Sequence, residues 1–340
     1  MIRKIARFFL LLAAFCLSGV ADERFPDSDI QWILDQYQVA EPVSLIPAEG
    51  LTGWTWHYGK EITQAKWSNP DGKKLLLDYS DKTRNLPGGD LVTAKQYTNF
   101  VLDFVWISTR GGNSGIKYRL KDFGAAGAKV NYSKDFGWLG CEYQILDDFN
   151  NGEGNRDAGQ WSTASLYSVF APDKEKKKLK PHGEVNTGRI VVLDNHIEHW
   201  LNGVKVLQYE IGSETWKKSI NGSKFWREDA KAEGFGENPS GFIMLQDHQH
   251  TITFEKVVIR EISGKKEPPD TGSDVAASTT DTGLSSADFP SADESPDPDA
   301  KPKRQKILPV AGLTEGVTAT ITISNGRESR RDTVKLDIAR

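Results

Sequence analysis

The chain has 340 residues, among them 31 glycine, 10 tryptophan, 15 phenylalanine and 9 tyrosine residues, which is enough apolar material for a sizeable core. Its formal net charge of -4 is unevenly spread. Nine acidic and no basic residues lie between Glu267 and Ala300, so the rest of the chain carries about +5. This balance gives no reason to expect a nucleic acid or an anionic membrane as a partner.

The first residues have the pattern of a secretory signal peptide. Basic residues lie within positions 1–7, an apolar run covers 8–17, and small residues end the segment at Ala21. We expect residues 1–21 to be removed, which places the mature chain in the periplasm or outside the cell. The apolar run is too short for a transmembrane segment, and no later stretch approaches about 18 apolar residues. One cysteine, Cys141, would remain, so no internal disulfide is expected.

The next part of the chain predicts a short helix followed by strands. Apolar residues at helical spacing indicate a helix over residues 27–38, with Ser28 or Asp29 as its cap. Residues 43–46 are typical of a strand that enters a turn. In residues 100–107, apolar residues alternate and predict a strand with one large apolar face.

Further alternation predicts a series of antiparallel strands. They cover residues 114–119, 140–148, 165–170, 189–193, 196–201, 204–209, 241–246 and 251–260. The pair Asn202-Gly203 between two of them is a strong hairpin signal, and a polar stretch at 214–232 is compatible with a helix. Many strands at hairpin spacing, without alternating helices, favour an all-β jelly-roll sandwich.

Composition divides the rest of the chain. We expect the sandwich to cover residues 22–263 and a disordered acidic linker, rich in Pro, Ser, Asp and Ala, to cover 264–306. Residues 307–340 then predict a short β tail around Asn325-Gly326. Because one hairpin is too little to be stable alone in water, the tail would dock on the main domain, bind a partner or be the remnant of a module.

The segment Gly140 to Asp148 is the most informative stretch. On a strand, Glu142 and Gln144 share one face with Leu146, whereas Cys141, Tyr143 and Ile145 share the other. Burying a carboxylate and a carboxamide on a strand is unfavourable unless these groups have partners. The sequence leaves open whether this polar face is a functional site or is simply exposed to solvent.

Six motifs, in order, resemble the 3-keto-disaccharide hydrolase domain family of exported bacterial proteins. They are LTGW (51–54), NSGIKYR (113–119), GCEYQILDD (140–148), ASLY (164–167), HIEHWLNG (196–203) and GFIMLQDH (241–248). The resemblance covers roughly residues 43–262. It implies a concanavalin A-like sandwich with a glycan-sized groove on one sheet, and action on sugars whose C3 hydroxyl has been oxidised to a ketone.

Such a site needs a base, an oxyanion donor and an acid. His248, just beyond a strand, is the best candidate for the base. Glu142 is a second candidate, or it orients a histidine or shares a metal with it. Arg119 is a candidate oxyanion donor, although pairing with a carboxylate such as Glu142 is its structural alternative. The expected substrate-binding residues are Asn113, Gln144, Tyr167 and Gln246.

Three alternatives remain open. Asp147 and its neighbours offer oxygen ligands for a divalent cation such as Ca²⁺, and Glu142 and His248 are further metal candidates, although a polar loop also explains the aspartates. An ordinary two-carboxylate glycosidase would pair Glu142 with Asp147, which requires a bulge to bring the two carboxyl groups close enough. A non-catalytic glycan-binding module would present polar and aromatic groups without any residue of shifted pKa.

Overall fold

The computed structural model describes residues 22–56, 62, 65–83, 86–133, 137–152, 159–267, 318–324 and 329–335. The chain falls into two compact units, residues 1–271 and 272–340. The predicted signal peptide and all but the first residues of the predicted linker lie outside the described residues.

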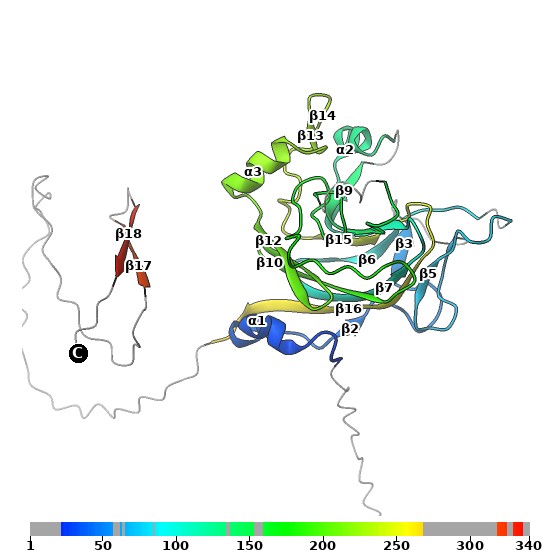
Figure 1. Cartoon of the computed structure of the whole chain (residues 1–340), viewed down its shortest axis with the longest axis horizontal. Coiled ribbons are helices and arrows are strands. Elements are labelled where there is room, and N and C mark those ends of the chain that lie inside the picture. Colours follow the sequence, from blue (N-terminus) through cyan, green and yellow to red (C-terminus); the bar gives the residue numbers. More distant parts are fainter. Residues whose placement is uncertain are drawn as a thin grey trace, which may run out of the picture. The chain divides into compact units, whose positions relative to one another are not determined.

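The first unit is a sandwich of two antiparallel sheets (Figure 1), which confirms the predicted all-β class. The nine-stranded sheet contains, in spatial order, β12 (Val204–Glu210), β11 (His196–Leu201), β10 (Asn186–Leu193), β7 (Phe100–Ser108), β16 (Ile252–Lys265), β5 (Leu75–Leu77) and β4 (Trp67–Ser68), with β1 (Tyr37–Val39) and β2 (Val43–Ser44) also paired to β16. The five-stranded sheet contains β3 (Trp54–Trp56), β6 (Leu91–Tyr97), β15 (Gly241–Leu245), β8 (Asn113–Asp122) and β9 (Trp138–Leu146).

The core lies between the two sheets and follows the predicted alternation. Phe104 and Trp106 of β7 point inward, as do Cys141, Tyr143 and Ile145 of β9. The rings of Phe104 and Tyr143 meet edge to face at 5.0 Å. The opposite face of β9, which carries Glu142 and Gln144, therefore points away from this core.

A short helical segment covers the outward face of the nine-stranded sheet. It consists of η1 (Asp27–Ile30) and α1 (Gln31–Gln36), and its buried Ile30 and Ile33 pack with Val191 of β10. The helix ends earlier than predicted because the chain turns at Tyr37 into β1, which pairs with β16. The predicted Ser28 or Asp29 cap is wrong, since neither helix start has a side-chain cap hydrogen bond.

Two other sequence predictions need correction. Residues 165–170 do not form a regular strand: Leu166 makes isolated bridges to Tyr143 and Phe170, and positive φ angles at Ala164 (67°) and Ser168 (66°) break the extension. The polar stretch after residue 214 forms a helix only in α3 (Glu214–Asn221), which begins at a Ser213 cap and is followed by the small hairpin of β13 (Trp226–Arg227) and β14 (Ala230–Lys231). A further short helix, α2 (Gly124–Val130), follows β8.

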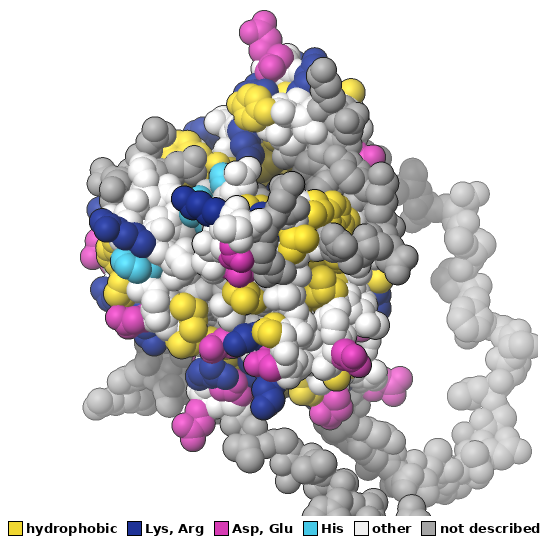
Figure 2. All heavy atoms as spheres, turned by 90° about the vertical axis from the view of Figure 1, so that its right-hand side faces the viewer, with side chains coloured by type: hydrophobic (Ala, Val, Ile, Leu, Met, Phe, Trp, Pro, Cys, Tyr) yellow, Lys and Arg dark blue, Asp and Glu magenta, His cyan; other side chains and the backbone are white. Residues whose placement is uncertain are grey.

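The second unit contains one described hairpin, in which β17 (Thr318–Ser324) pairs antiparallel with β18 (Ser329–Lys335). This agrees with the predicted β tail. In the described part of the chain, no helix has the length and apolar character needed to span a membrane. Figure 2 shows acidic and basic side chains interspersed with hydrophobic ones on one face of the molecule, so the described side chains form no extended field of one sign there.

Candidate active site on the five-stranded sheet

The outward face of the five-stranded sheet carries a row of four side chains at matching register. Val92 of β6 lies opposite Met244 of β15, Met244 opposite Lys117 of β8, and Lys117 opposite Glu142 of β9. All four residues are buried, although the two at one end of the row are charged. The row is thus apolar on β6 and β15 and charged on β8 and β9.

The next row along the same strands is more polar, and one of its positions is a glycine without a side chain. Gly115 of β8 lies opposite Gln144 of β9 and accepts a hydrogen bond from the backbone N–H of Gln246 at 2.9 Å. A Cβ on Gly115 would lie 2.5 Å from Oε1 of Glu142. The carboxylate of Glu142 therefore leans from its own row over the glycine, into space that any larger residue would fill.

Lys117 and Glu142 form a buried ion pair. Lys117 Nζ lies 3.8 Å from Glu142 Oε2, and their side chains are 8% and 4% exposed. Because a buried charge is unfavourable without a partner, each of these residues compensates for the burial of the other.

A third ionisable group, Asp90, lies on the same face and interacts with this pair. Burial raises the pKa of the Asp90 carboxyl to about 6, and the nearby Lys117 ammonium limits the rise. The backbone N–H of Asp247 donates to Asp90 Oδ1 at 2.8 Å. The Glu142 and Asp247 carboxylates also raise the pKa of Asp90, so the three acids act on one another. Asp90 therefore changes its protonation state close to neutral pH.

Asp247 anchors this end of the face. Its Oδ2 accepts hydrogen bonds from the Tyr79 hydroxyl at 2.9 Å and from the Gly89 N–H at 2.8 Å, and its Oδ1 accepts from the Gln249 N–H at 2.9 Å. Burial and the neighbouring Asp247 raise the pKa of Tyr79. The tyrosine hydroxyl thus remains a hydrogen-bond donor, and it fixes Asp247 and, through the backbone of Asp247, the Asp90 carboxyl.

Three of the predicted substrate-binding residues belong to this face. Asn113 lies on β8, Gln144 on β9, and Gln246 directly after β15. The side-chain carbonyl oxygens of all three are buried and have no hydrogen-bond partner among the residues that the structure describes. Because buried polar atoms are normally satisfied, this concentration is typical of a face that binds a polar ligand.

Tyr167, the fourth predicted substrate-binding residue, lies at the free edge of β9. Its backbone N–H donates to the carbonyl oxygen of Glu142 at 3.0 Å, so it is adjacent to the charged pair. The Lys224 ammonium lies 4.3 Å from the centre of its ring. The irregular segment that replaces the predicted strand thus places Tyr167 beside the site.

From the other end of the row of Lys117 onward, the same face is apolar. Val92, Leu120 and Met244 form a small cluster on which the partly exposed rings of Trp138 and Phe242 pack. These two rings lie 5.4 Å apart, centre to centre. The face therefore combines a charged region with an aromatic platform, as glycan sites commonly do.

Arg119 does not belong to this site. A bulge between Tyr118 and Lys121 gives Arg119 a φ angle of 50°, and its guanidinium donates to the carbonyl oxygens of Gly236 and Asp194. Since Asp194 lies in the turn between β10 and β11, the side chain crosses to the other sheet. The expectation that Arg119 pairs with Glu142 or serves as an oxyanion donor beside it is wrong, and Lys117 is the cation that accompanies the carboxylate.

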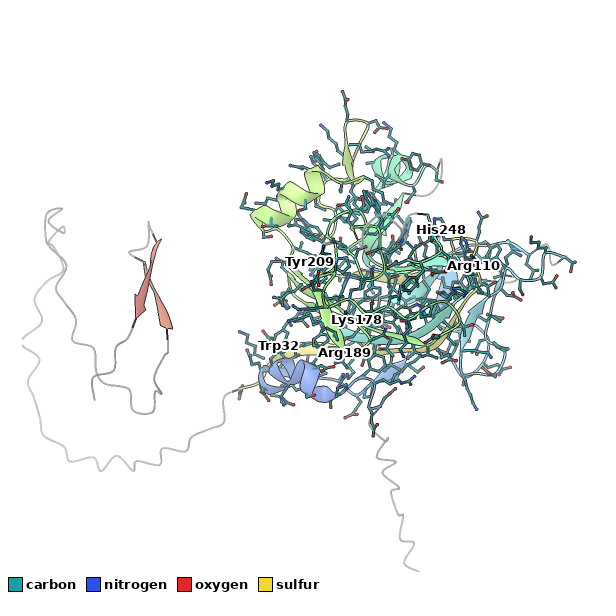
Figure 3. The ribbon with its side chains drawn as sticks, in the orientation of Figure 1. Trp32, Arg110, Lys178, Arg189, Tyr209 and His248 are labelled. Atoms are coloured by element: carbon teal, nitrogen blue, oxygen red, sulfur yellow. The ribbon has the colours of Figure 1, made fainter. Side chains whose placement is uncertain are left out.

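His248 lies one residue after Asp247, beyond the end of β15. Its side chain is exposed, and its ring stacks against that of His250 at 6.4 Å. Figure 3 shows it on the same side of the sandwich as Arg110, which lies in the turn between β7 and β8. No hydrogen bond or ion pair joins it to Glu142 in the described part of the chain. His248 is therefore an exposed residue beyond the strand end, whereas Glu142 is buried on the sheet.

The carboxylate of Asp147 forms its hydrogen bonds within the loops beside β9. Its carboxylate accepts hydrogen bonds from the Gly111 N–H at 2.8 Å and the Asn150 amide at 2.9 Å, and it lies 3.3 Å from Nδ1 of His182. Burial alone would raise the pKa of Asp147, but hydrogen bonds from Gly111, Asn150 and Phe149 hold it below its usual range. The carboxylate therefore stabilises these loops, and its partners among the described residues are Gly111, Phe149, Asn150 and His182.

Within the described ranges, no three His, Cys, Asp or Glu side chains are grouped so that they could hold a metal ion. The predicted metal candidates Glu142, His248 and Asp147 do not converge. The neighbouring Asp148 is also engaged, because it pairs with Lys177 at 2.6 Å and accepts the Thr163 N–H at 2.9 Å.

Sequence reasoning missed Asp90, Lys117 and Asp247. Lys117 was detectable, because it lies two residues after Gly115 and alternation places both on one face. Asp90 has no such signal, because its position depends on how β6 pairs with β15, about 150 residues later in the chain.

Comparisons with known proteins identify a family and several similar proteins. The sequence model of a family described as 3-keto-alpha-glucoside-1,2-lyase-like domain matches residues 41–260. A 3-keto-disaccharide hydrolase of Bacteroides thetaiotaomicron is 29% identical over 229 residues, which is 64% of this chain and 77% of that protein. Two crystal structures of Parabacteroides distasonis proteins assigned to the glycosyl hydrolases are also similar. One is 30% identical and covers 64% of this chain and 92% of its own, with a TM-score of 0.49. The other is 25% identical and covers 65% and 99%, with a TM-score of 0.47.

Proposed function

Because the chain belongs to the 3-keto-alpha-glucoside-1,2-lyase-like domain family, we propose that it cleaves the glycosidic bond of 3-keto glycosides or 3-keto-disaccharides. Its Bacteroides thetaiotaomicron relative, a 3-keto-disaccharide hydrolase, supports sugar hydrolysis as the class of reaction. The observation that carries the proposal is the buried cluster of Asp90, Lys117 and Glu142 on the five-stranded sheet. Residues 1–21 support the further proposal that the enzyme acts after export.

The reaction begins beside the ketone. A carbonyl at C3 acidifies the C2–H bond, so a base removes the C2 proton and the electron pair moves onto the C3 oxygen as an enolate. When the C3 carbonyl forms again, the electrons form a C1–C2 double bond and the C1–O bond to the leaving group breaks. The leaving oxygen takes a proton from an acid. Addition of water across the double bond then completes a net hydrolysis.

The cluster offers one group to remove the C2 proton and another to stabilise the enolate oxygen. Asp90, with a pKa of about 6, is largely ionised at neutral pH and is still basic enough to take a proton, so we assign it as the general base. Lys117 is assigned to stabilise the enolate oxygen, because a buried ammonium acts strongly on a developing negative charge. Glu142 then serves as the positioning residue that holds Lys117 in place.

The remaining groups fit the rest of the substrate. The unpaired amide oxygens of Asn113, Gln144 and Gln246 would accept hydrogen bonds from sugar hydroxyls. The aromatic platform of Trp138 and Phe242 would carry the leaving group. His248, beyond the end of β15, and Tyr167, beside β9, are the proposed sources of the proton for the leaving oxygen.

Two observations support this proposal over the glycosidase and the binding module. A retaining glycosidase would need Glu142 and Asp147 as a close carboxyl pair, whereas Asp147 is engaged in the loop with Gly111 and Asn150. A binding module would not require a buried carboxyl group with a pKa near 6 beside a buried lysine. The enzyme proposal uses these groups and the binding proposal does not.

The test is to incubate the purified mature chain with a 3-keto glucoside and with its unoxidised parent, with and without a chelator. We expect aglycone release from the keto sugar alone, and the chelator arm reports whether a divalent cation takes part. Release from the parent sugar would support the two-carboxylate glycosidase, and binding of either sugar without release would support the module.

A second measurement tests the chemistry. Deuterium at C2 of the keto sugar should slow release, and an Asp90→Asn variant should lose both release and the exchange of the C2 proton with solvent. Asp71→Asn, which changes an exposed aspartate elsewhere, is the matched control and should retain full activity. Release that is unaffected by C2 deuteration and by Asp90→Asn would overturn the assignment of Asp90 as the base.

A further inference from the structure

A cavity lies on the opposite side of the sandwich from the candidate active site. It occupies about 610 Å³ on the outward face of the nine-stranded sheet, beside the helical segment. Its lining comes from α1, β1, β11, β12 and the turn between β10 and β11 and consists of Trp32, Tyr37, Leu193, Asp194, Asn195, His196, Glu198, Lys205, Gln208 and Glu210. Figure 3 shows Trp32 on α1, well away from His248. This volume is in the range of small-molecule sites.

The polar wall of this cavity is organised around one carboxylate. Glu198, whose side chain is 2% exposed, accepts hydrogen bonds from Lys205 Nζ at 2.7 Å, Trp200 Nε1 at 2.8 Å and His196 Nε2 at 3.2 Å. Burial alone would raise the pKa of Glu198, but these hydrogen bonds hold it below its usual range. The carboxylate is therefore ionised and held in one orientation before any ligand arrives.

The lining carries three carboxylates, Asp194, Glu198 and Glu210, and two basic side chains, Lys205 and His196. His196 lies between Glu198 and Glu210, and its Nδ1 is 2.5 Å from Glu210 Oε1. The hydrogen bonds that His196 donates to these two carboxylates, chiefly that to Glu198, raise its pKa. Lys205 contacts both Glu198 and the side-chain oxygen of Gln208, which lies at 2.8 Å. This excess of carboxylates disfavours an anionic ligand, and the fixed donors and acceptors suit the hydroxyl groups of an uncharged polar ligand.

Aromatic rings form the other wall. The ring of Trp32 stands nearly perpendicular to that of His196, with centres 5.5 Å apart and an interplanar angle of 85°. The helical segment is fixed beneath it by Ile30 and Ile33, which are buried against the sheet. Tyr37 adds a second ring at the end of the helix. The aromatic wall is thus held by the fold and is available for stacking.

We propose that this cavity is a second carbohydrate site, which binds a ring of a neutral oligosaccharide between Trp32 and the Glu198 network. A sugar ring has apolar C–H faces that stack on an indole and a rim of hydroxyls that donate to a fixed carboxylate. The two sheets of the sandwich separate this site from Glu142, so it binds glycan without taking part in the reaction. Its role is to hold the enzyme on a longer glycan chain.

The experiment measures binding of five unoxidised neutral tetrasaccharides (maltotetraose, cellotetraose, laminaritetraose, mannotetraose and xylotetraose) to the mature chain by calorimetry. Trp32→Ala removes the aromatic wall, and Glu198→Gln removes the charge at nearly constant shape. Tyr132→Ala, which removes an 83% exposed ring elsewhere, is the matched control. Glu142→Gln separates this site from the candidate active site. Circular dichroism verifies that each variant is folded.

We expect at least one tetrasaccharide to bind, with affinity about 10-fold weaker or worse in Trp32→Ala and Glu198→Gln and unchanged in Tyr132→Ala and Glu142→Gln. Trp32→Ala should also release aglycone from a small 3-keto glucoside at the normal rate. The proposal is overturned if none of the five binds, or if binding survives Trp32→Ala and is lost in Glu142→Gln. Because the probes are unoxidised and no turnover is needed, this outcome is independent of the proposed reaction.

Discussion

Replacing Asp90 with asparagine should abolish activity and at the same time stabilise the fold. In the folded protein, burial raises the pKa of Asp90 from 3.8 to about 6. At about 1.36 kcal/mol per pH unit, ionised Asp90 destabilises the folded state by up to about 3 kcal/mol at neutral pH. Asparagine keeps an oxygen that accepts the Asp247 N–H, so the variant removes the charge without removing the hydrogen bond. We expect a gain of about 1–3 kcal/mol, because asparagine removes a charge whose burial is unfavourable.

The gain should depend on pH in a defined direction. The folded state binds a proton on Asp90 more tightly than the unfolded state does, so this group lowers stability as the pH rises from about 4 to about 6. Below that window Asp90 is protonated in both states, and the wild type and Asp90→Asn should differ little. Above it the difference should be constant.

Urea unfolding at about pH 4 and about pH 8 measures both quantities, with Asp71→Asn as the control because Asp71 is an exposed residue. The pH dependence of kcat/KM of the wild type should show a loss of activity below about pH 6, where the base becomes protonated. The reasoning is refuted if Asp90→Asn is less stable than the wild type at the higher pH, or if the difference between the two proteins is the same at both pH values.

Three further changes test other parts of the structure. Lys117→Met leaves Glu142 buried without its cation and should lower the free energy of unfolding, measured in urea, by about 3–5 kcal/mol. The double variant Lys117→Met with Glu142→Gln should recover most of this stability, and no recovery would argue against the pair. Gly115→Ala places a Cβ 2.5 Å from Glu142 Oε1 and should lower kcat by on the order of 100-fold, and an unchanged kcat would show that the carboxylate position is not critical. Burial raises the pKa of the Cys141 thiol to about 12, so iodoacetamide at about pH 8 should label it only after denaturation; rapid labelling of the native protein would contradict its place in the core.

The local pattern of the sequence was a good guide wherever a strand is regular. The alternation in β9 correctly placed Cys141 and Tyr143 in the core and Glu142 and Gln144 on the other face, because the side-chain period of a strand is fixed by backbone geometry. The hairpin at Asn202-Gly203 followed in the same way from turn chemistry. The family and the all-β class were also accessible from the sequence, because they depend on ordered motifs and on alternation.

The sequence by itself therefore determined which side chains of each strand share a face. Which faces meet was decided only by the tertiary structure. Asp90 reaches Lys117 because β15 pairs with both β6 and β8, and pairing between distant strands leaves no local pattern. Arg119 was misassigned because a bulge and a φ angle of 50° interrupt the alternation, and its side chain then finds carbonyl partners on the other sheet. The pKa of Asp90 depends on both burial and charge, and these arise only when the strands assemble.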